Sequence, residues 1–216
     1  MSACSLGRLS EATNEAITPY FDENHTRKRP LLGVDEAGRG ALAGPIIACA
    51  VQFKPTFSLH SQLNDSKQLS ATQRHTIFNA MKDDIYLGVG MASHRLIDKI
   101  NVFQATMVAM TKAINKIANS DHHVIIDGNR VPKIEGPTCE AIVKADTKVG
   151  EVKAASICAK VLRDRLMEKY DRFLPEYGFK KHKGYGTKLH YTALFDYGKS
   201  VIHRHSFNLS KQLTLW

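Results

Sequence analysis

The chain contains few cysteines and no long apolar run. Its 216 residues include four cysteines, Cys4, Cys49, Cys139 and Cys158, which are scattered without a Cys-x-x-Cys pair. This pattern speaks against a zinc site and is typical of reduced thiols, with Cys49 and Cys158 interpreted as small core residues. No stretch approaches the roughly 20 apolar residues that span a bilayer, and the N-terminus does not resemble a secretion signal. We therefore expect a cytoplasmic protein with no membrane partner.

Basic residues are unevenly distributed along the chain. The formal net charge is +9, and residues 144–216 hold 15 Lys and Arg against 7 Asp and Glu. Such an asymmetry suggests a surface for a polyanion, most often a nucleic acid. A solvated basic face is the ordinary alternative, so the asymmetry alone does not decide the partner.

The hydrophobic pattern predicts one α/β domain over residues 30–207, with helices packed on a mixed sheet. Residues 1–29 are polar and lack periodicity, so we expect a loosely ordered extension. Residues 208–216 form a C-terminal tail. Strands are predicted at 31–34, 46–53, 85–94, 123–126 and 141–144, and helices at 70–82, 102–118 and 151–173, with a further helix ending at Tyr197.

Four carboxylates, those of Asp35, Glu36, Asp127 and Asp146, come directly after short apolar runs. In open α/β sheets the ligand crevice lies beyond such strand ends. Taken singly, each acid is more often a turn residue or a helix cap. Together, converging carboxylates repel one another unless a cation is present, and oxygen ligands favour Mg²⁺ or Mn²⁺.

Asp35 and Glu36 are adjacent, and consecutive residues of a strand point to opposite faces. We therefore expect the first strand to end between them if both are to reach one site. Gly38 and Gly40 would allow the backbone to turn or bulge there.

Several sequence blocks between residues 31 and 207 resemble type 2 ribonucleases H (ribonuclease HII). The blocks are LLGVDEAGRGALAGPIIACAV, DSKQLS, VIIDGN, IVKADTKVGEVKAASICAKVLRD, HKGYGT and HRHSF, in that order. The resemblance implies a ribonuclease H-like α/β fold, a mixed sheet flanked by helices, with a helical C-terminal part. It implies that the metal ligands are Asp35, Glu36, Asp127 and Asp146. It also implies two-metal hydrolysis of RNA–DNA hybrids, and cutting 5′ to single ribonucleotides in DNA, which leaves 3′-hydroxyl and 5′-phosphate ends.

The same resemblance implies how substrate is bound. Gly38-Arg39-Gly40 would let the backbone approach the ribose 2′-hydroxyl, with Arg39 facing a phosphate. Tyr185 would stack on the sugar beyond the ribonucleotide, at the RNA-to-DNA junction. The remaining candidates are basic or polar residues expected to contact phosphates: Lys67, Lys153, Ser156, Lys160, Arg163 and Lys183. Four of them, from Lys153 to Arg163, recur at helical spacing, although a solvated basic face is the ordinary explanation of such a stripe.

Two positions depart from the family pattern. Ala41 stands where proline is usual, which would loosen the loop after Gly40, and Ala145 replaces glycine before the fourth acid, which is tolerable if its φ is negative. A type 3 ribonuclease H is the runner-up, and residues 1–29 are too short for its extra domain. A type 1 enzyme or a junction resolvase lacks the adjacent Asp-Glu before Gly-Arg-Gly. A catalytically silent hybrid-binding protein would not need all four acids.

The last five residues, QLTLW, resemble the short peptide with which bacterial repair proteins bind the DNA sliding clamp. Two leucines and an aromatic residue can fill a partner's pocket, and clamp binding would concentrate the enzyme on newly made DNA. Alternatively, the same side chains fold back onto the domain. The residues expected to bind the clamp are Gln212, Leu213, Leu215 and Trp216.

Overall fold

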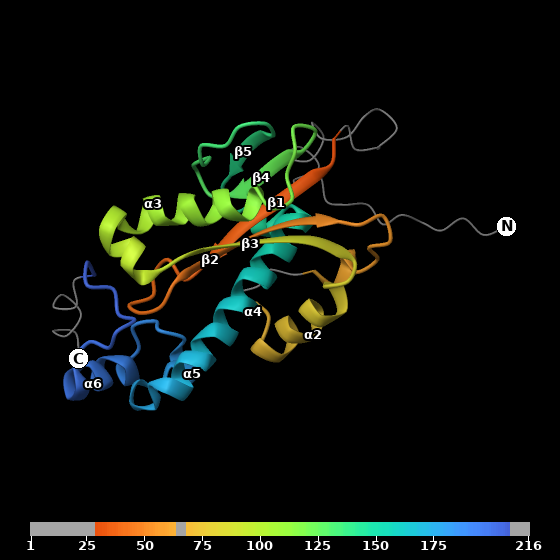
Figure 1. Ribbon diagram of the computed structural model, residues 1–216. Coiled ribbons are helices and arrows are strands. Elements are labelled where there is room, and N and C mark those ends of the chain that lie inside the picture. The colour runs from red at the N-terminus through yellow and green to blue at the C-terminus, as the bar shows by residue number, and fades with distance from the viewer. Residues whose placement is uncertain (1–28, 64–67, 208–216) are drawn as a thin grey trace.

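The computed structural model describes residues 29–63 and 68–207. A five-stranded mixed sheet lies at its centre, in the order β3-β2-β1-β4-β5 (Figure 1). β1 pairs antiparallel with β2 and parallel with β4, and β4 is parallel to β5. The strands are β1 (Leu31–Ala37), β2 (Ile46–Phe53), β3 (Ile85–Ala92), β4 (His123–Asp127) and β5 (Thr138–Ile142). The predicted mixed sheet is confirmed.

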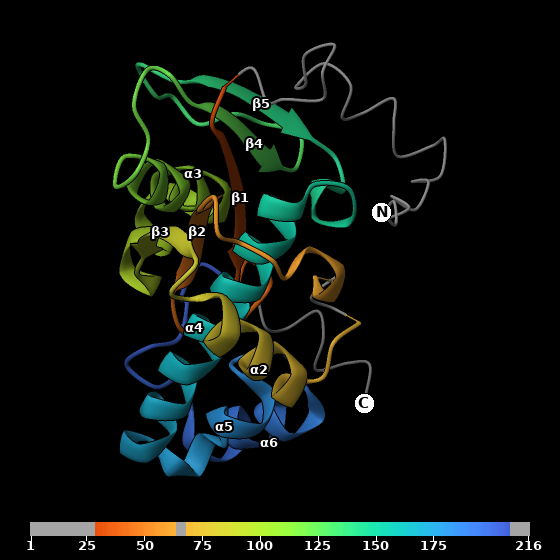
Figure 2. The same cartoon turned by 90° about the vertical axis from the view of Figure 1, so that its right-hand side faces the viewer.

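Helices cover both faces of the sheet. They are α2 (Ala71–Met81), α3 (His94–Ile114), α4 (Gly150–Phe173), α5 (Phe179–His182) and α6 (Lys188–Tyr197), with short 3₁₀ turns at His60–Gln62, Ala145–Thr147 and Pro175–Tyr177. α2 and α4 pack on one face and α3 on the other, while α5 and α6 extend the structure beyond the sheet (Figure 2). Within the described residues, no helix is long and apolar enough to cross a membrane.

α3 begins eight residues earlier than the sequence pattern predicted. Its first segment starts at His94, where the Ser93 hydroxyl accepts a hydrogen bond from the Leu96 amide. Asn101 interrupts the helix with φ 65°, and its side chain accepts a hydrogen bond from the Gln104 amide. The predicted helix start at residue 102 therefore corresponds to the second segment. The predicted start of α2 is confirmed, with Ser70 as its N-cap.

β1 continues further than expected. It runs through Asp35 and Glu36 to Ala37, and both acids are paired with β2, opposite Cys49 and Ala48. The expectation that the strand ends between the two acids is therefore wrong. The strand continues because β2 offers a partner to every residue from Gly33 to Ala37.

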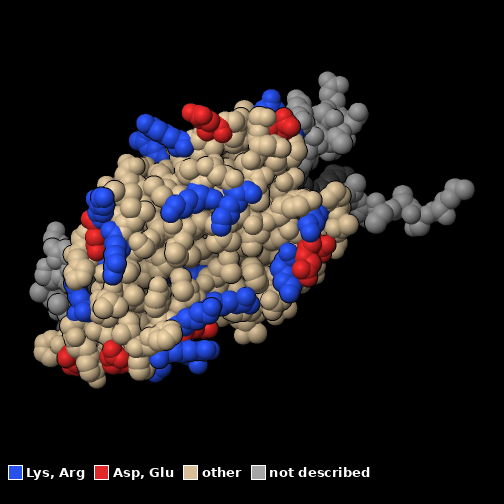
Figure 3. Space-filling model, in the orientation of Figure 1, with Lys and Arg blue, Asp and Glu red and all other residues tan. Residues whose placement is uncertain are grey.

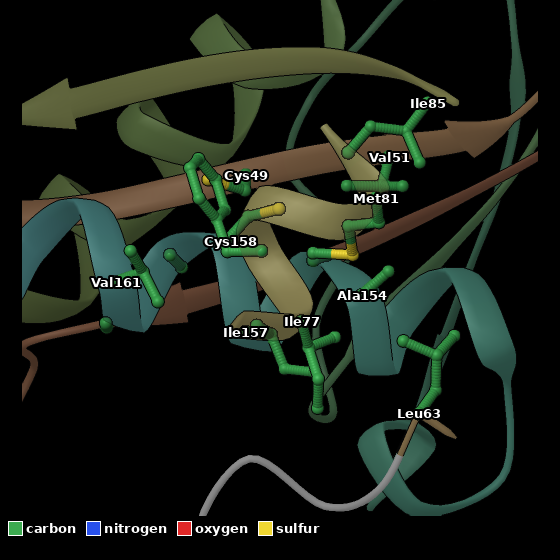
Figure 4. Packing of buried hydrophobic residues seen from close by; sticks show 14 of the residues in the cluster. Cys49, Val51, Leu63, Ile77, Met81, Ile85, Ala154, Ile157, Cys158 and Val161 are labelled. Atoms are coloured by element: carbon green, nitrogen blue, oxygen red, sulfur yellow. The ribbon is translucent and has the colours of Figure 1, made fainter. Parts of the chain in front are cut away.

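The core between α4, α2 and the sheet contains two thiols. Cys49 and Cys158 are fully buried there, close to Met81 (Figure 4). This confirms their interpretation as core residues, and burial raises the pKa of both thiols. α4 also approaches β1 closely, because a Cβ at Gly33 would overlap the backbone of Glu151 and Val152. This contact fixes the first turn of α4 beside Gly33, in the first half of β1.

Candidate active site

Three aspartates converge at one edge of the sheet. Asp35 lies near the end of β1, Asp127 is the last residue of the adjacent parallel strand β4, and Asp146 lies in the 3₁₀ turn before α4. One carboxylate oxygen of each lies within 4.8 Å of the others. The Ala145 amide donates a 2.8 Å hydrogen bond to Asp127 Oδ1, which ties the turn carrying Asp146 to β4. Ala145 does not have a positive φ, so alanine is accommodated there.

Glu36 lies at the margin of this group. Because β1 is regular, its side chain leaves the opposite face from Asp35. It is not one of the three residues within 4.8 Å. Glu36 Oε1 accepts a hydrogen bond from Arg39 Nη1 at 3.3 Å, so the two side chains form an ion pair. Glu36 still lines the same cleft as Asp35 and Asp127. Asp35, Asp127 and Asp146 are thus brought together, whereas Glu36 borders the site.

The pKa values of two of the acids, Asp35 and Glu36, are raised. Burial raises the pKa of Asp35 well above its usual range, and the Glu36 and Asp127 charges raise it further, against a hydrogen bond from Ser156. Burial also raises the pKa of Glu36, which the neighbouring Arg39 opposes. A divalent cation would relieve this repulsion, and three carboxylate oxygens within 4.8 Å provide the hard ligands that such an ion prefers. The donor set therefore fits Mg²⁺ or Mn²⁺.

The cleft in front of the acids has a volume of about 520 Å³. Its lining includes the acids Asp35, Glu36 and Asp127, the loop residues Gly38, Arg39 and Gly40, and also Ser156, Lys160, Tyr185 and Arg74. Gly38 has φ 100°, and a Cβ there would overlap the Arg163 side chain. A Cβ at Gly40 would meet no protein atom within 4 Å, so packing within the protein does not require glycine at that position. The surface at Gly40 is open to a ligand.

Tyr185 forms one wall of the cleft. Its half-buried ring lies 5.5 Å from Lys160 Nζ and 5.1 Å from Arg163 Cζ. Lys160 Nζ also contacts Asp164 Oδ1 at 2.8 Å. The ring is therefore held over the basic side of α4, with its position set by two cations.

Arg163 does not take the predicted role. Its side chain is fully buried, and it donates to the carbonyls of Pro45 (3.0 Å), Lys183 (2.9 Å) and Ala43 (3.1 Å). This position disagrees with the predicted phosphate contact, because the side chain has no exposed surface and each of its three nitrogens donates to a backbone carbonyl. It instead joins the loop after β1 to the segment that carries Tyr185.

The other predicted phosphate ligands differ in their surroundings. Ser156 is buried beside Asp35, and Lys183 Nζ contacts Glu168 Oε1 at 2.7 Å, so neither presents a free group to solvent. Lys153 and Lys160 are half-buried on α4. Lys67 lies outside the described residues, as do Gln212, Leu213, Leu215 and Trp216.

The sequence patterns missed Arg204, which lies in the HRHSF block. It is fully buried and donates to the carbonyls of Gly38 (2.6 Å), Arg39 (2.7 Å) and Gly44 (3.0 Å). Burial, reinforced by the charge of Arg163, lowers its pKa to about 9. Arg204 therefore fixes the backbone of the Gly-Arg-Gly loop from the protein interior. The block was the only signal that could have pointed to it.

The match to a family model decides the relationship of this chain to known proteins. The model of ribonuclease HII covers residues 32–210. The chain belongs to the ribonuclease HII family. It is 43% identical to ribonuclease HII of Clostridioides difficile over 93% of this chain and 78% of the relative. It is 45% identical to that of Acholeplasma laidlawii over 87% of this chain and 90% of the relative. Ribonuclease HII proteins are ribonuclease H enzymes.

Solved structures agree with this family. Ribonuclease H2 from Pyrococcus horikoshii is 26% identical and superposes with a TM-score of 0.70 over 85% of this chain and 96% of that one. The ribonuclease HII of the PCNA complex from Archaeoglobus fulgidus has a TM-score of 0.72 at 22% identity, covering 83% and 96%. Bst-RNase HIII in complex with Mn²⁺ shares the fold, with a TM-score of 0.65 at 20% identity, but the match covers 87% of this chain and 70% of that one.

Proposed function

We propose that this ribonuclease HII cuts on the 5′ side of ribonucleotides, both in RNA–DNA hybrids and where one ribonucleotide is embedded in duplex DNA. The products would carry 3′-hydroxyl and 5′-phosphate ends. The observation that carries the proposal is the convergence of Asp35, Asp127 and Asp146 within 4.8 Å, in a cleft bordered by the Gly38–Gly40 loop.

Divalent ions, Mg²⁺ or Mn²⁺, would be held by Asp35, Asp127 and Asp146, with Glu36 at the margin. When bound as a pair, such ions supply Lewis-acid stabilisation of the attacking and departing oxygens of a phosphodiester. The burial of Asp35 restricts water around its carboxylate and orients it toward the two other aspartates. Ser156 holds that carboxylate through a hydrogen bond.

The protein itself would select the ribonucleotide. The open surface at Gly40 allows backbone groups to reach the 2′-hydroxyl, which is the feature that distinguishes RNA from DNA. Two buried guanidiniums, those of Arg163 and Arg204, hold the carbonyls of this loop and keep its shape. Tyr185 would pack on the next sugar, on the 3′ side of the ribonucleotide, because its ring forms the cleft wall along α4.

The decisive experiment is a cleavage assay on three duplexes: all DNA, DNA with one ribonucleotide, and an RNA–DNA hybrid. We expect cuts in the last two with Mg²⁺ or Mn²⁺ and none with a chelator. End-labelled products should map to the 5′ side of the ribonucleotide and accept ligation as 3′-hydroxyl ends. Cutting of the all-DNA duplex, or tight binding of the hybrid with no cleavage under either ion, would contradict the proposal. The second outcome would favour a silent hybrid-binding protein.

A further inference from the structure

A second groove lies beside the acid cleft, between α3 and the segment that joins β4 to β5. Its volume is about 960 Å³, and its walls come from residues 103–112 and 128–133. We call it the α3 groove. Glu36, Arg39 and Asp127 line both the α3 groove and the acid cleft, so the two hollows are continuous.

The α3 groove is lined by more cations than carboxylates. The cations are Arg39, Lys112, Arg130 and Lys133, and the carboxylates are the two shared with the acid cleft. Arg130 and Lys133 are exposed, and within the described part of the chain neither has an ion pair or a side-chain hydrogen bond. Figure 3 shows that Lys and Arg side chains stand in the middle of the face that carries α3, with acidic side chains toward its edges. The surface is therefore suited to an anion.

Apolar side chains lie beside these cations. Phe103 is 37% exposed and Val131 is 42% exposed, on opposite walls of the α3 groove. A cationic groove is suited to a nucleic-acid backbone, and the apolar side chains on its walls can pack on the sugars. An acidic peptide would satisfy the charges alone, but continuity with the cleft favours the polymer that is cut there.

The α3 groove and Tyr185 lie on opposite sides of the acids. α3 packs on one face of the sheet and α4 on the other, and Tyr185 rests over Lys160 and Arg163 of α4. A strand that passes Tyr185 and crosses the acids would thus continue toward α3. In this arrangement the acid cleft, at Tyr185, and the α3 groove would bind the substrate on opposite sides of the cut.

We infer that the α3 groove binds the backbone of the duplex arm on the 5′ side of the ribonucleotide, with Arg130 and Lys133 contacting its phosphates. The inference rests on the proposed function, in which Tyr185 takes the 3′ side. The two cations do not line the acid cleft, so they would act on binding and not on the reacting phosphate. Their loss therefore raises KM and leaves kcat unchanged.

The test compares Arg130→Ala/Lys133→Ala with a matched control, Lys54→Ala/Lys82→Ala. Lys54 and Lys82 lie where β2 ends and β3 begins, at the end of the sheet opposite the acids. Cleavage kinetics in Mg²⁺ are measured at several salt concentrations on single-ribonucleotide duplexes with a full 5′ arm, a 5′ arm reduced to a few base pairs, or a shortened 3′ arm. Thermal melting of each variant monitors folding.

For the groove variant we expect a higher KM on the full and 3′-shortened substrates, and a KM like that of the unmodified protein on the 5′-shortened one. The slope of log KM against log salt should fall by about 0.9 for each lost phosphate contact, so by about 1.8 for the pair. An equal KM increase on the 5′-shortened substrate, an unchanged slope, or the same effect in the control would overturn the inference.

Failure of the inference can be distinguished from failure of the proposed function. If the unmodified protein cuts and the groove variant behaves like the control, only the groove assignment fails. If the unmodified protein cuts no ribonucleotide, the same duplexes are compared by equilibrium binding. A 5′-arm-dependent loss of affinity in the groove variant would then support the groove alone, and equal affinities would reject both.

Discussion

His190 and His203 share a hydrogen bond between their Nε2 atoms, 2.9 Å apart, in the interior of the C-terminal helical part. The Ser200 amide donates to His203 Nδ1 at 2.8 Å, so the proton of neutral His203 lies on Nε2. His190 Nε2 accepts it, which leaves His190 Nδ1–H to donate to the Tyr185 carbonyl at 3.0 Å. Both rings are therefore neutral, and the chain of bonds ends at the backbone of the proposed junction tyrosine.

This relationship predicts a loss of stability in acid. Burial lowers the pKa of His190 to about 4, with a contribution from His182, and the pKa of His203 to about 3, with a contribution from His190; the usual value is 6.5. As the pH falls from about 6.5 toward 4, the unfolded chain binds protons that the folded protein excludes. The contribution of these two histidines to the free energy of unfolding should thus be constant above pH 6.5 and become unfavourable below it, by up to about 1.4 kcal/mol per pH unit for each histidine.

Urea unfolding between pH 7.5 and 4.5 measures this slope. His203→Gln should flatten it, although the variant is less stable at neutral pH because a buried hydrogen bond is lost. His205→Gln, at an exposed position, should keep the slope of the unmodified protein. A slope that His203→Gln leaves unchanged would show that these histidines are not responsible.

Asp35→Asn should nearly abolish cleavage while hybrid binding stays measurable, because it removes a metal-binding charge but little phosphate-binding surface. The raised pKa of Asp35 means that its charge costs folding free energy without a cation. The metal-free variant should therefore melt at the same or a higher temperature than the metal-free unmodified protein. Asp196→Asn, at an exposed site on α6, is the control and should change neither quantity. Substantial remaining cleavage in Asp35→Asn would reject the site.

Tyr185→Ala should impair cleavage at single ribonucleotides more than it weakens Mn²⁺ binding, because the proposed contact of the ring is with substrate and not with the metal-binding acids. Tyr185→Phe keeps the ring over Lys160 and Arg163 and should retain most activity. Cleavage kinetics and Mn²⁺ titration check the two effects. A parallel loss of both in Tyr185→Ala would assign the tyrosine a structural role.

Arg163→Ala should destabilise the fold, by about 3 kcal/mol or more, since it leaves three buried backbone carbonyls without their donor. Lys153→Ala, on the same helix but half-buried, should unfold within about 0.5 kcal/mol of the unmodified protein. It should instead lower the salt dependence of hybrid binding, by about 0.9 in the log–log slope. Chemical denaturation and salt titration separate the two cases. Equal stability of both variants would contradict the buried role of Arg163.

Removal of residues 212–216 should abolish binding to a bacterial sliding clamp without changing cleavage of short duplexes. The expectation rests on the QLTLW peptide alone, and these residues lie outside the described part of the chain. Titration of clamp with full-length and truncated protein tests it, and thermal melting of both forms is the control. Equal affinities would reject clamp binding. So would a large fall in melting temperature on truncation together with no clamp binding by the full-length protein.

Local patterns in the sequence were sufficient for the order of the five strands and of the longer helices, although they did not predict the short α5. Apolar runs that end in acids located β1 and β4, and Ser70 marked the start of α2, because such signals depend on neighbours within one or two turns. The family blocks then singled out Asp35 and Asp127, which the parallel pairing of β1 with β4 brings together. At Asp35 and Asp127 the sequence prediction and the structure agree.

Tertiary structure alone decided what Arg163 and Glu36 do. Helical spacing placed Arg163 on the same stripe as Lys160, but its partners Pro45 and Ala43 are 118 and 120 residues away in the chain. The face on which Glu36 lies depended on whether β1 continued, and that was determined by the pairing offered by β2. Periodicity reports which side of an element a residue occupies. Whether that side meets solvent, substrate or buried carbonyls is determined by segments distant in the chain, because burial and hydrogen bonding arise only where such segments pack together.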